Sequence, residues 1–395
     1  MLPLQIKENI YDVSVQDWDV RDFHGYKTER GATYNSYLIM DEKICLIDTV
    51  KAPFAEELIN NIRSVIDPAQ IDYIVINHVE PDHSGAMPVL AKLCPKAKFI
   101  ITMQGKTEAI QHYGDIFDFI VAKDGDTLEL GKRTLQFATM PMLHWPDSMA
   151  TYSAYDKILF SNDAFGQHYA TSKRFDDEVE LDVLYYEAKK YFANILWPYA
   201  KLIDKAIAKL GGLDFDLIAP SHGVIWRSHL NDIINMYQQW GSGVKDGSIV
   251  VAYDSMWGGT EKIARAISKG VAKAGVEVKL FKVSCTENSS IAAELFTASG
   301  FLVGSSTLNY GMLPSVGALL TYVKGLKPMQ KKAAAFGTFG WAGGAQKDME
   351  EFLNKAGFNV FDGYTCKWKP QAAELETAEK FGYEFAQNLD CQCER

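Results

Sequence analysis

The stretch NHVEPDHSG, residues 77–85, places four side chains that can bind a metal within a few positions of one another. The four are His78, Glu80, Asp82 and His83. The preceding IDYIVI, residues 71–76, has the apolar composition of a buried strand, and Gly85 with the apolar run after it predicts a turn into a helix. Nitrogen and oxygen donors gathered at a strand end indicate a metal site.

Three further candidate ligands follow other predicted strands. They are His144 after RTLQFATM (133–140), Asp163 at the end of KILFSND (157–163) and His222 at the end of DLIAPSH (216–222). Strands that run together through a sheet present their ends at a common edge, so distant residues can meet there. We therefore expect these three residues to join the first four.

Counted by type, the seven candidates form two equal sets and one remainder. The sets are His78, Glu80 and His144, and Asp82, His83 and His222, and the remaining residue is Asp163. Each set has two imidazoles and one carboxylate, which suits non-haem iron(II) that activates small molecules. The remaining carboxylate can bridge two cations, and three carboxylates offset much of the charge of two buried metals.

Length and composition limit the kind of protein. The chain has 395 residues, which predicts two domains, with 47% apolar and 23% charged residues. Its net charge of -10 disfavours nucleic acid and anionic membranes as partners. No run is long and apolar enough to span a bilayer, and the start MLPLQIKENIYD lacks a secretion signal. Six scattered cysteines without a C-x2-C pair favour a reducing cytoplasm, and we expect no metal or redox role for Cys391 and Cys393.

The first half of the chain mixes short strands with helices and long loops, and we assign residues 1–245 to this domain. Strands are predicted at 43–50, 71–76, 98–103, 133–140, 157–163 and 216–222, and helices at 54–66 and 183–210, the second broken at Pro198. The polar segment GSGVKDGS, residues 241–248, is predicted to be a linker.

From residue 248 to 395 strands and helices alternate regularly. Strands are predicted at 248–253, 276–283, 300–305, 331–340 and 358–364, and helices at 258–275, 290–298, 314–326, 345–357 and 372–389. This alternation predicts a parallel sheet with helices on both faces. Five strands in this length match a flavodoxin-like doubly wound domain.

Three loops after strands of this second domain are candidates for binding a cofactor. Their residues are Ser255, Met256, Trp257, Gly258, Gly259 and Thr260; Ser305, Thr307, Leu308, Asn309 and Tyr310; and Gly337, Phe339, Gly340, Trp341, Gly343 and Gly344. The first loop resembles the flavin phosphate loop of flavodoxins, because hydroxyls and backbone N–H groups at a helix N-terminus bind a phosphate. The aromatic residues can cover an isoalloxazine ring. No G-x-G-x-x-G follows a strand, so NAD is not indicated.

The ordered ligand pattern resembles the flavodiiron proteins, which carry a metallo-β-lactamase-like αββα sandwich before a flavodoxin-like domain. The pattern is H-x-E-x-D-H at 78–83, then LHWPDSM, SNDAFGQ and PSHG. Zinc hydrolases of this fold commonly carry His at the position of Glu80, and the harder carboxylate favours iron. The resemblance implies two iron ions, FMN as the second cofactor, and reduction of dioxygen to water, of nitric oxide to nitrous oxide, or of both.

The resemblance also implies partners and further site residues. Family members form head-to-tail homodimers or dimers of dimers, with the flavin of one subunit facing the iron pair of the other. Electrons are expected from a separate carrier, either rubredoxin or a reduced deazaflavin. His24 matches a histidine often found near the irons and is the candidate catalytic residue. Phe192 stands where the family often has Tyr, so gas preference does not transfer from relatives.

Two other classes of function remain open from the sequence. A dizinc hydrolase with an attached flavodoxin domain is the main alternative, and a non-catalytic electron-transfer protein with a vestigial metal site is the other. Glu80 in place of His disfavours the first, and the complete set of seven ligands disfavours the second. Metal content separates all three hypotheses.

Overall fold

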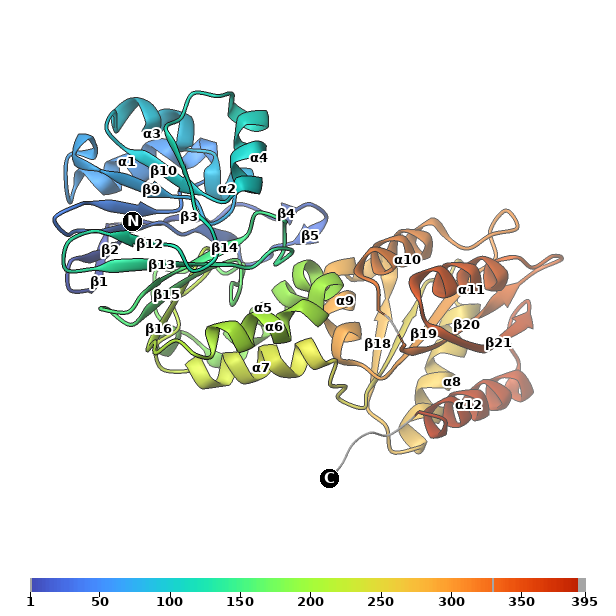
Figure 1. Ribbon diagram of the computed structural model, residues 1–395. Helices are drawn as coiled ribbons and strands as arrows, with labels where there is room; N and C mark the ends of the chain where they lie inside the picture. The colour runs from blue at the N-terminus through green and yellow to red at the C-terminus, as the bar shows by residue number, and fades with distance from the viewer. Residues whose placement is uncertain (1, 329, 390–395) are drawn as a thin grey trace. The chain divides into compact units, whose positions relative to one another are not determined.

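The computed structural model describes residues 2–328 and 330–389, which form two compact units (Figure 1). The first unit comprises the residues up to His24, Thr28–Tyr191 and Tyr199–Ser242, and the second comprises Gly25–Lys27, Phe192–Pro198 and the chain from Gly243. The described cysteines, Cys45, Cys94, Cys285 and Cys366, are all free. Cys391 and Cys393 lie outside the described residues.

The first unit contains two large sheets. One has the strand order β1-β2-β7-β8-β9-β10-β11 and the other has the order β12-β13-β14-β15-β16. The strands of the first are β1 Leu4–Lys7, β2 Ile10–Asp12, β7 Tyr37–Ile39, β8 Cys45–Ile47, β9 Tyr73–Val75, β10 Lys98–Ile101 and β11 Phe119–Val121. Those of the second are β12 Thr127–Glu129, β13 Thr134–Thr139, β14 Met149–Ser153, β15 Ile158–Asn162 and β16 Leu217–Pro220. Short strands β3 Val15–Asp17 and β6 Ala32–Tyr34 pair separately in this unit. The chain also contains the two-residue strands β4 Asp22–Phe23 and β5 Tyr26–Lys27.

Helices cover the sheets, and apolar layers join them. The helices are α1 Ala55–Arg63, α2 Pro81–Ser84, α3 Met87–Leu93, α4 Met103–Tyr113, α5 Leu181–Tyr191, α6 Ala200–Leu210 and α7 Leu230–Ser242. In α1, Leu58, Ile59 and Ile62 are buried on one face, against residues of the first sheet such as Leu46 and Ile74. A second core, which includes Ile47 and residues of both sheets, fills the space between them. Figure 1 shows α1, α3 and α4 beside the first sheet and α5–α7 beside the second, which is the expected αββα sandwich.

The six strands predicted for this unit are confirmed, and all are shorter than expected. The sequence prediction missed the other six strands of the two large sheets, which are β1, β2, β7, β11, β12 and β14. In β14, MATYS is buried throughout between β13 and β15 but has no apolar run or alternation. The predicted long helix is broken at and before Pro198, by a π-helical turn over Phe192–Leu196 and a 3₁₀ turn over Trp197–Tyr199. The linker begins later than the predicted residue 241, because α7 continues to Ser242.

The second unit is a five-stranded parallel sheet with the order β18-β17-β19-β20-β21. Its strands are β17 Ile249–Tyr253, β18 Val278–Lys282, β19 Gly300–Ser306, β20 Lys332–Phe339 and β21 Asn359–Lys367. Its helices are α8 Gly259–Lys273, α9 Asn288–Thr297, α10 Pro314–Leu326, α11 Ala345–Ala356 and α12 Ala372–Gln387. In order along the chain the strands are arranged 2-1-3-4-5, the flavodoxin order, and every predicted element is confirmed. Separate apolar cores lie on the two faces of the sheet.

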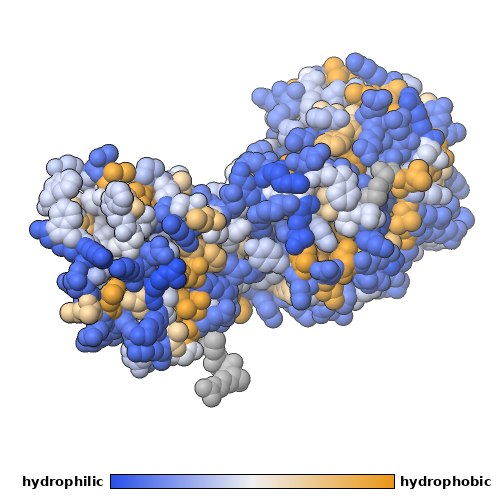
Figure 2. All heavy atoms as spheres, turned by 180° about the vertical axis from the view of Figure 1, so that it is seen from behind, coloured by the Kyte–Doolittle hydropathy of each residue, from blue (hydrophilic) through white to orange (hydrophobic). Residues whose placement is uncertain are grey.

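Among the described residues, no helix is both long and apolar enough to cross a membrane. Figure 2 shows hydrophilic residues over much of the visible surface, with hydrophobic residues scattered between them.

Candidate metal centre and flavin cavity

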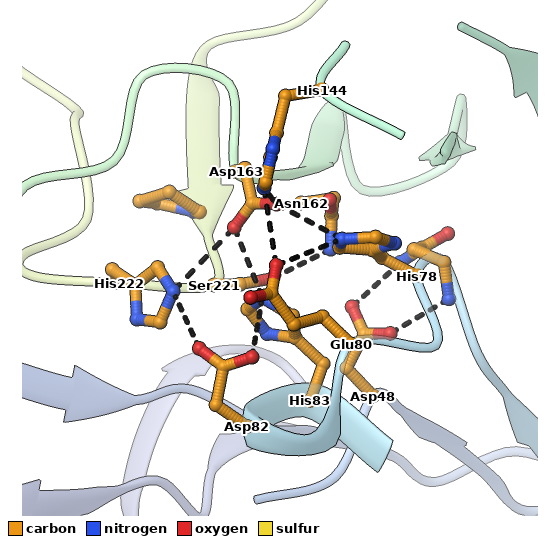
Figure 3. Close-up of polar contacts among 12 residues, drawn as sticks. Asp48, His78, Glu80, Asp82, His83, His144, Asn162, Asp163, Ser221 and His222 are labelled. Carbon is orange, nitrogen blue, oxygen red and sulfur yellow. Dashed lines mark hydrogen bonds and ion pairs between the residues drawn. The ribbon is translucent and has the colours of Figure 1, made fainter. Parts of the chain in front are cut away.

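The seven predicted ligands meet at one edge of the two sheets of the first unit (Figure 3). His78 and Glu80 lie in the loop after β9, and the short helix α2 carries Asp82 and His83. His144 lies in the loop after β13, Asp163 directly follows β15, and His222 follows β16. The sequence spacing is large, and the shared sheet edge brings the side chains together.

One set of donors, which we call position one, contains His78, Glu80 and His144. Glu80 Oε2 lies 3.4 Å from His78 Nε2 and 3.2 Å from His144 Nε2. Both imidazoles therefore turn their Nε2 atoms toward the same carboxylate oxygen, as ligands of one cation would.

The other set, which we call position two, contains Asp82, His83 and His222. Asp82 Oδ1 lies 3.5 Å from His83 Nε2, and Asp82 Oδ2 lies 3.3 Å from His222 Nε2. Ligand atoms of these three residues all lie within 4.8 Å of one another. This is the same combination of two imidazoles and one carboxylate.

Asp163 divides its two oxygens between the positions. Oδ2 lies 3.8 Å from His78 Nε2 and 3.5 Å from His144 Nε2. Oδ1 lies 3.0 Å from His83 Nε2 and 3.5 Å from His222 Nε2. Both Asp163 oxygens are buried and accept no hydrogen bond, and the same is true of Asp82 Oδ1. Buried carboxylate oxygens without donors are costly unless a cation meets them, so the donor set fits two metal ions.

The electrostatics of the cluster also favour cations. Burial raises the pKa of Asp163, but the His83, His78 and His144 imidazoles outweigh burial and hold this pKa well below its usual range. Burial lowers the pKa of His83, but the charges of Asp82 and Asp163 raise it to about 9. Asp163 thus stays ionised in spite of its burial, and its negative charge favours a cation beside it.

The imidazoles are supported from behind by different groups. His78 Nδ1 lies 2.9 Å from Asp147 Oδ1, whereas His222 Nδ1 lies 2.7 Å from the carbonyl oxygen of Thr33. These contacts orient each ring so that Nε2 faces the centre.

Position one is the accessible side of the cluster. The side chain of His144 is 16% exposed, whereas His83 and His222 of position two are fully buried. His24, the candidate catalytic residue, is 77% exposed and lies with Nε2 3.3 Å from Glu80 Oε1. A small molecule can therefore reach position one past His24.

The loops of the second unit form a cavity of about 530 Å³. Of the predicted residues, Met256, Trp257, Gly259, Thr307, Asn309, Tyr310, Phe339, Gly340 and Trp341 line it. Its aromatic rim and size suit a planar ring system. Trp257 is 94% exposed and Trp341 81%, so the rim is open in the single chain.

The hydroxyl groups of Ser306 and Thr338 line the cavity and meet the buried side chain of Thr260. Thr260 Oγ1 lies 3.0 Å from Ser306 Oγ and 2.9 Å from Thr338 Oγ1. Ser255 Oγ is buried without a hydrogen-bond partner, and no side chain caps the N-terminus of α8. Unsatisfied donors at a helix N-terminus fit a phosphate group, so the cavity fits FMN.

The other predicted loop residues do not line the cavity. They are Ser255, Gly258, Thr260, Ser305, Leu308, Gly337, Gly343 and Gly344. Several shape the loops instead: a Cβ at Gly344 would collide with the Tyr310 carbonyl oxygen, and the Ser305 hydroxyl accepts from Leu313 N.

Sequence reasoning missed several residues of both sites. The cavity is also lined by Ser306, Thr338, Ala342, Trp368 and Lys369. At the metal cluster, Asp147 was overlooked although it lies three residues after His144. His168, which was given no role in the site, is buried with its ring centroid 4.9 Å from that of His222. Phe192 is buried against Phe296 in the second unit.

Comparisons with known proteins match two separate parts of the chain to two family models. A family model of ODP-type β-lactamase domains matches residues 32–223, and the flavodoxin model matches residues 251–382. A nitric oxide reductase of Moorella thermoacetica is 44% identical over 98% of this chain and 99% of its own length. The solved rubredoxin oxygen:oxidoreductase of Desulfovibrio gigas is 40% identical, with a TM-score of 0.95 and 98% of each chain covered. The flavodiiron protein of Giardia intestinalis is 36% identical, with a TM-score of 0.96, covering 98% of this chain and 96% of that one.

Proposed function

Since this chain belongs to the flavodiiron protein family, we propose that it is an oxidoreductase that reduces nitric oxide, dioxygen or both at a non-haem diiron centre, with electrons passed through FMN. The observation that carries the proposal is the division of the Asp163 oxygens between two donor sets of equal composition. With both sites in one protein, bound FMN would store electrons and the metal centre would deliver them to the gas.

The seven proposed iron ligands are His78, Glu80, Asp82, His83, His144, Asp163 and His222. Glu80 supports iron over zinc, because it gives position one an anionic oxygen donor where the zinc hydrolases carry a third imidazole. Bound iron supplies open coordination positions for a small gas and bound FMN supplies stored electrons.

The residues of the chain position the substrate and supply a proton. His144 and His24 line the accessible side, so we assign gas binding to position one. His24 can donate a hydrogen bond to a gas molecule bound there, because its Nε2 already lies 3.3 Å from Glu80. The buried side chains of position two exclude water from the far side of the cluster.

We assign FMN to the cavity of the second unit, with its phosphate near Thr260, Ser306 and Thr338 and its ring among Trp257, Tyr310 and Trp341. The exposed rim aromatics support a homodimer or dimer of dimers in which a second copy covers the cavity, because exposed apolar rings favour association. Electrons come from a separate reduced carrier such as rubredoxin.

The test of the function is His144→Ala, because this residue belongs to position one and lies outside the flavin unit. Reduced wild-type protein mixed anaerobically with nitric oxide or with dioxygen should be reoxidised rapidly by at least one of them. The variant should keep its flavin spectrum and lose this reaction. Retention of full activity by His144→Ala would overturn the assigned site.

Metal analysis separates this function from the dizinc hydrolase. About two irons per chain are expected from the two donor sets of the proposed centre. Two zinc ions per chain together with hydrolytic activity would favour the alternative.

A further inference from the structure

We infer that Asp147 makes the two metal positions unequal, so that position one binds its metal more tightly and offers it more electron-rich ligands than position two. The inference rests on the proposed diiron function and concerns a residue outside the seven ligands. Asp147 is a positioning residue, because it acts on the metal through His78.

Asp147 holds the back of His78 with both carboxylate oxygens. His78 Nδ1 lies 2.9 Å from Oδ1 and 3.1 Å from Oδ2, and Val79 N donates to Oδ2 at 2.7 Å. Thr102 Oγ1 donates to the Asp147 backbone carbonyl at 3.0 Å, which fixes the segment. The carboxylate is buried, so no water competes for the imidazole.

The other imidazoles do not have such a partner. His222 Nδ1 faces the neutral carbonyl of Thr33, and His83 Nδ1 is buried with no hydrogen-bond partner. No contact within ion-pair distance joins His144 Nδ1 to a carboxylate among the described residues. Of the four imidazoles in the cluster, only His78 has a carboxylate behind it.

A carboxylate behind an imidazole strengthens the ligand. When Nδ1–H donates to an anion, electron density moves toward Nε2 and the ring becomes a stronger donor to the metal. Asp147 also adds a negative charge beside the metal bound by His78. Both effects stabilise a cation at position one, and the more highly charged cation most.

The test is stepwise loading of metal-free, FMN-containing protein with cobalt(II) under anaerobic conditions. Calorimetry and cobalt absorption should resolve a tight and a weaker step in the wild type. Asp147→Asn keeps the side-chain size and removes the charge, so the tight step should weaken about 10- to 100-fold while the weaker step stays unchanged.

Mössbauer spectra of protein loaded with iron-57 give a second readout that does not depend on activity. Two inequivalent iron signals are expected in the wild type. In Asp147→Asn one signal should shift toward the other, and the other signal should stay in place.

Asp48→Asn is the matched control. Asp48 is an equally buried carboxylate in the loop after β8, but it accepts hydrogen bonds from Asn77 N and Nδ2 and makes no hydrogen bond to a ligand imidazole (Figure 3). The Asp48 variant should lower thermal stability without changing the ratio of the two cobalt affinities.

The outcomes separate this inference from the proposed function. Two-metal binding with equal loss of both steps in Asp147→Asn, or with no loss, would overturn the role of Asp147 and leave the diiron function standing. Failure of the wild type to bind two metals would overturn the proposed function itself.

Discussion

The metal cluster and the flavin cavity use opposite physical strategies. The cluster gathers charged side chains from distant segments and buries them, with Asp163 and His83 both inaccessible. The cavity is neutral apart from Lys369, is lined by several aromatic residues, and is open at Trp257 and Trp341. A buried set of charges needs its ions to be stable, whereas an open apolar cradle can exist without its ligand. Mutation or ligand removal should therefore affect the two sites differently.

The largest effect is expected from Asp163→Asn. The amide cannot bridge two cations with two anionic oxygens, so both positions lose a ligand. Iron should fall below about one per chain and gas reduction should drop by roughly 1,000-fold or more, because bound metal supplies the reaction site. Metal analysis and stopped-flow spectroscopy measure this, and unchanged flavin absorbance is the internal control. Normal iron content in this variant would contradict the bridging role.

The second effect is that of chelation on stability. Iron removal leaves ionised Glu80, Asp82 and Asp163 close together, so the first unit should unfold at a temperature lower by about 5 °C or more. Calorimetry measures that transition, while flavin fluorescence follows the second unit. Removal of FMN should shift only the second transition. Equal shifts of both transitions after chelation would show that the two sites are not independent.

The sequence revealed the cluster almost completely because its chemistry lies in side chains. Each of the seven ligands is a distinctive residue at a strand end. Asp147 was missed because nothing in the sequence PDS indicates that its carboxylate contacts a ligand. Only the folded loop brings it to His78. Asp163 was expected to bridge because its carboxylate was left over once the other six donors were paired, and its oxygens do face both sets.

The sequence was less informative about the cavity because its lining depends on where the strands end and the loops begin. The last strand was predicted to end at residue 364, but β21 continues to Lys367. Its final TCK is polar and reads as a loop, whereas pairing with β20 extends it. That extension carries Trp368 and Lys369 to the cavity, and neither was predicted there.

The third prediction concerns the phosphate end of the cavity. Thr338→Val removes a hydroxyl that lines the cavity and meets Thr260 while keeping the side-chain shape. A hydrogen bond to a charged group contributes about 1.5–3 kcal/mol, so the FMN dissociation constant should rise roughly 10- to 100-fold. Fluorescence titration measures it, with Thr377→Val on the exposed face of α12 as the control. Unchanged FMN affinity in Thr338→Val would move the phosphate away from this cluster.

The smallest expected effect comes from Lys331, a buried lysine of the second unit. Lys331 donates to the Ala298 carbonyl at 2.5 Å, and burial lowers its pKa to about 7. The unfolded chain holds this proton up to about pH 10.4, so between the two values the unfolded state binds more protons and stability rises with pH. Below pH 7 Lys331 is charged in the folded protein, so burial of this charge lowers the free energy of unfolding by its full amount.

Lys331→Met removes that cost and also the hydrogen bond. At pH 6 the variant should be more stable by about 2 kcal/mol, and by pH 10 the gain should vanish or reverse as the lost hydrogen bond becomes the only difference. Urea unfolding followed by flavin fluorescence measures both curves, and Lys347→Met on the exposed face of α11 should show no such crossing. If the stabilities of Lys331→Met and wild type changed with pH in parallel, Lys331 would not be buried as a charge.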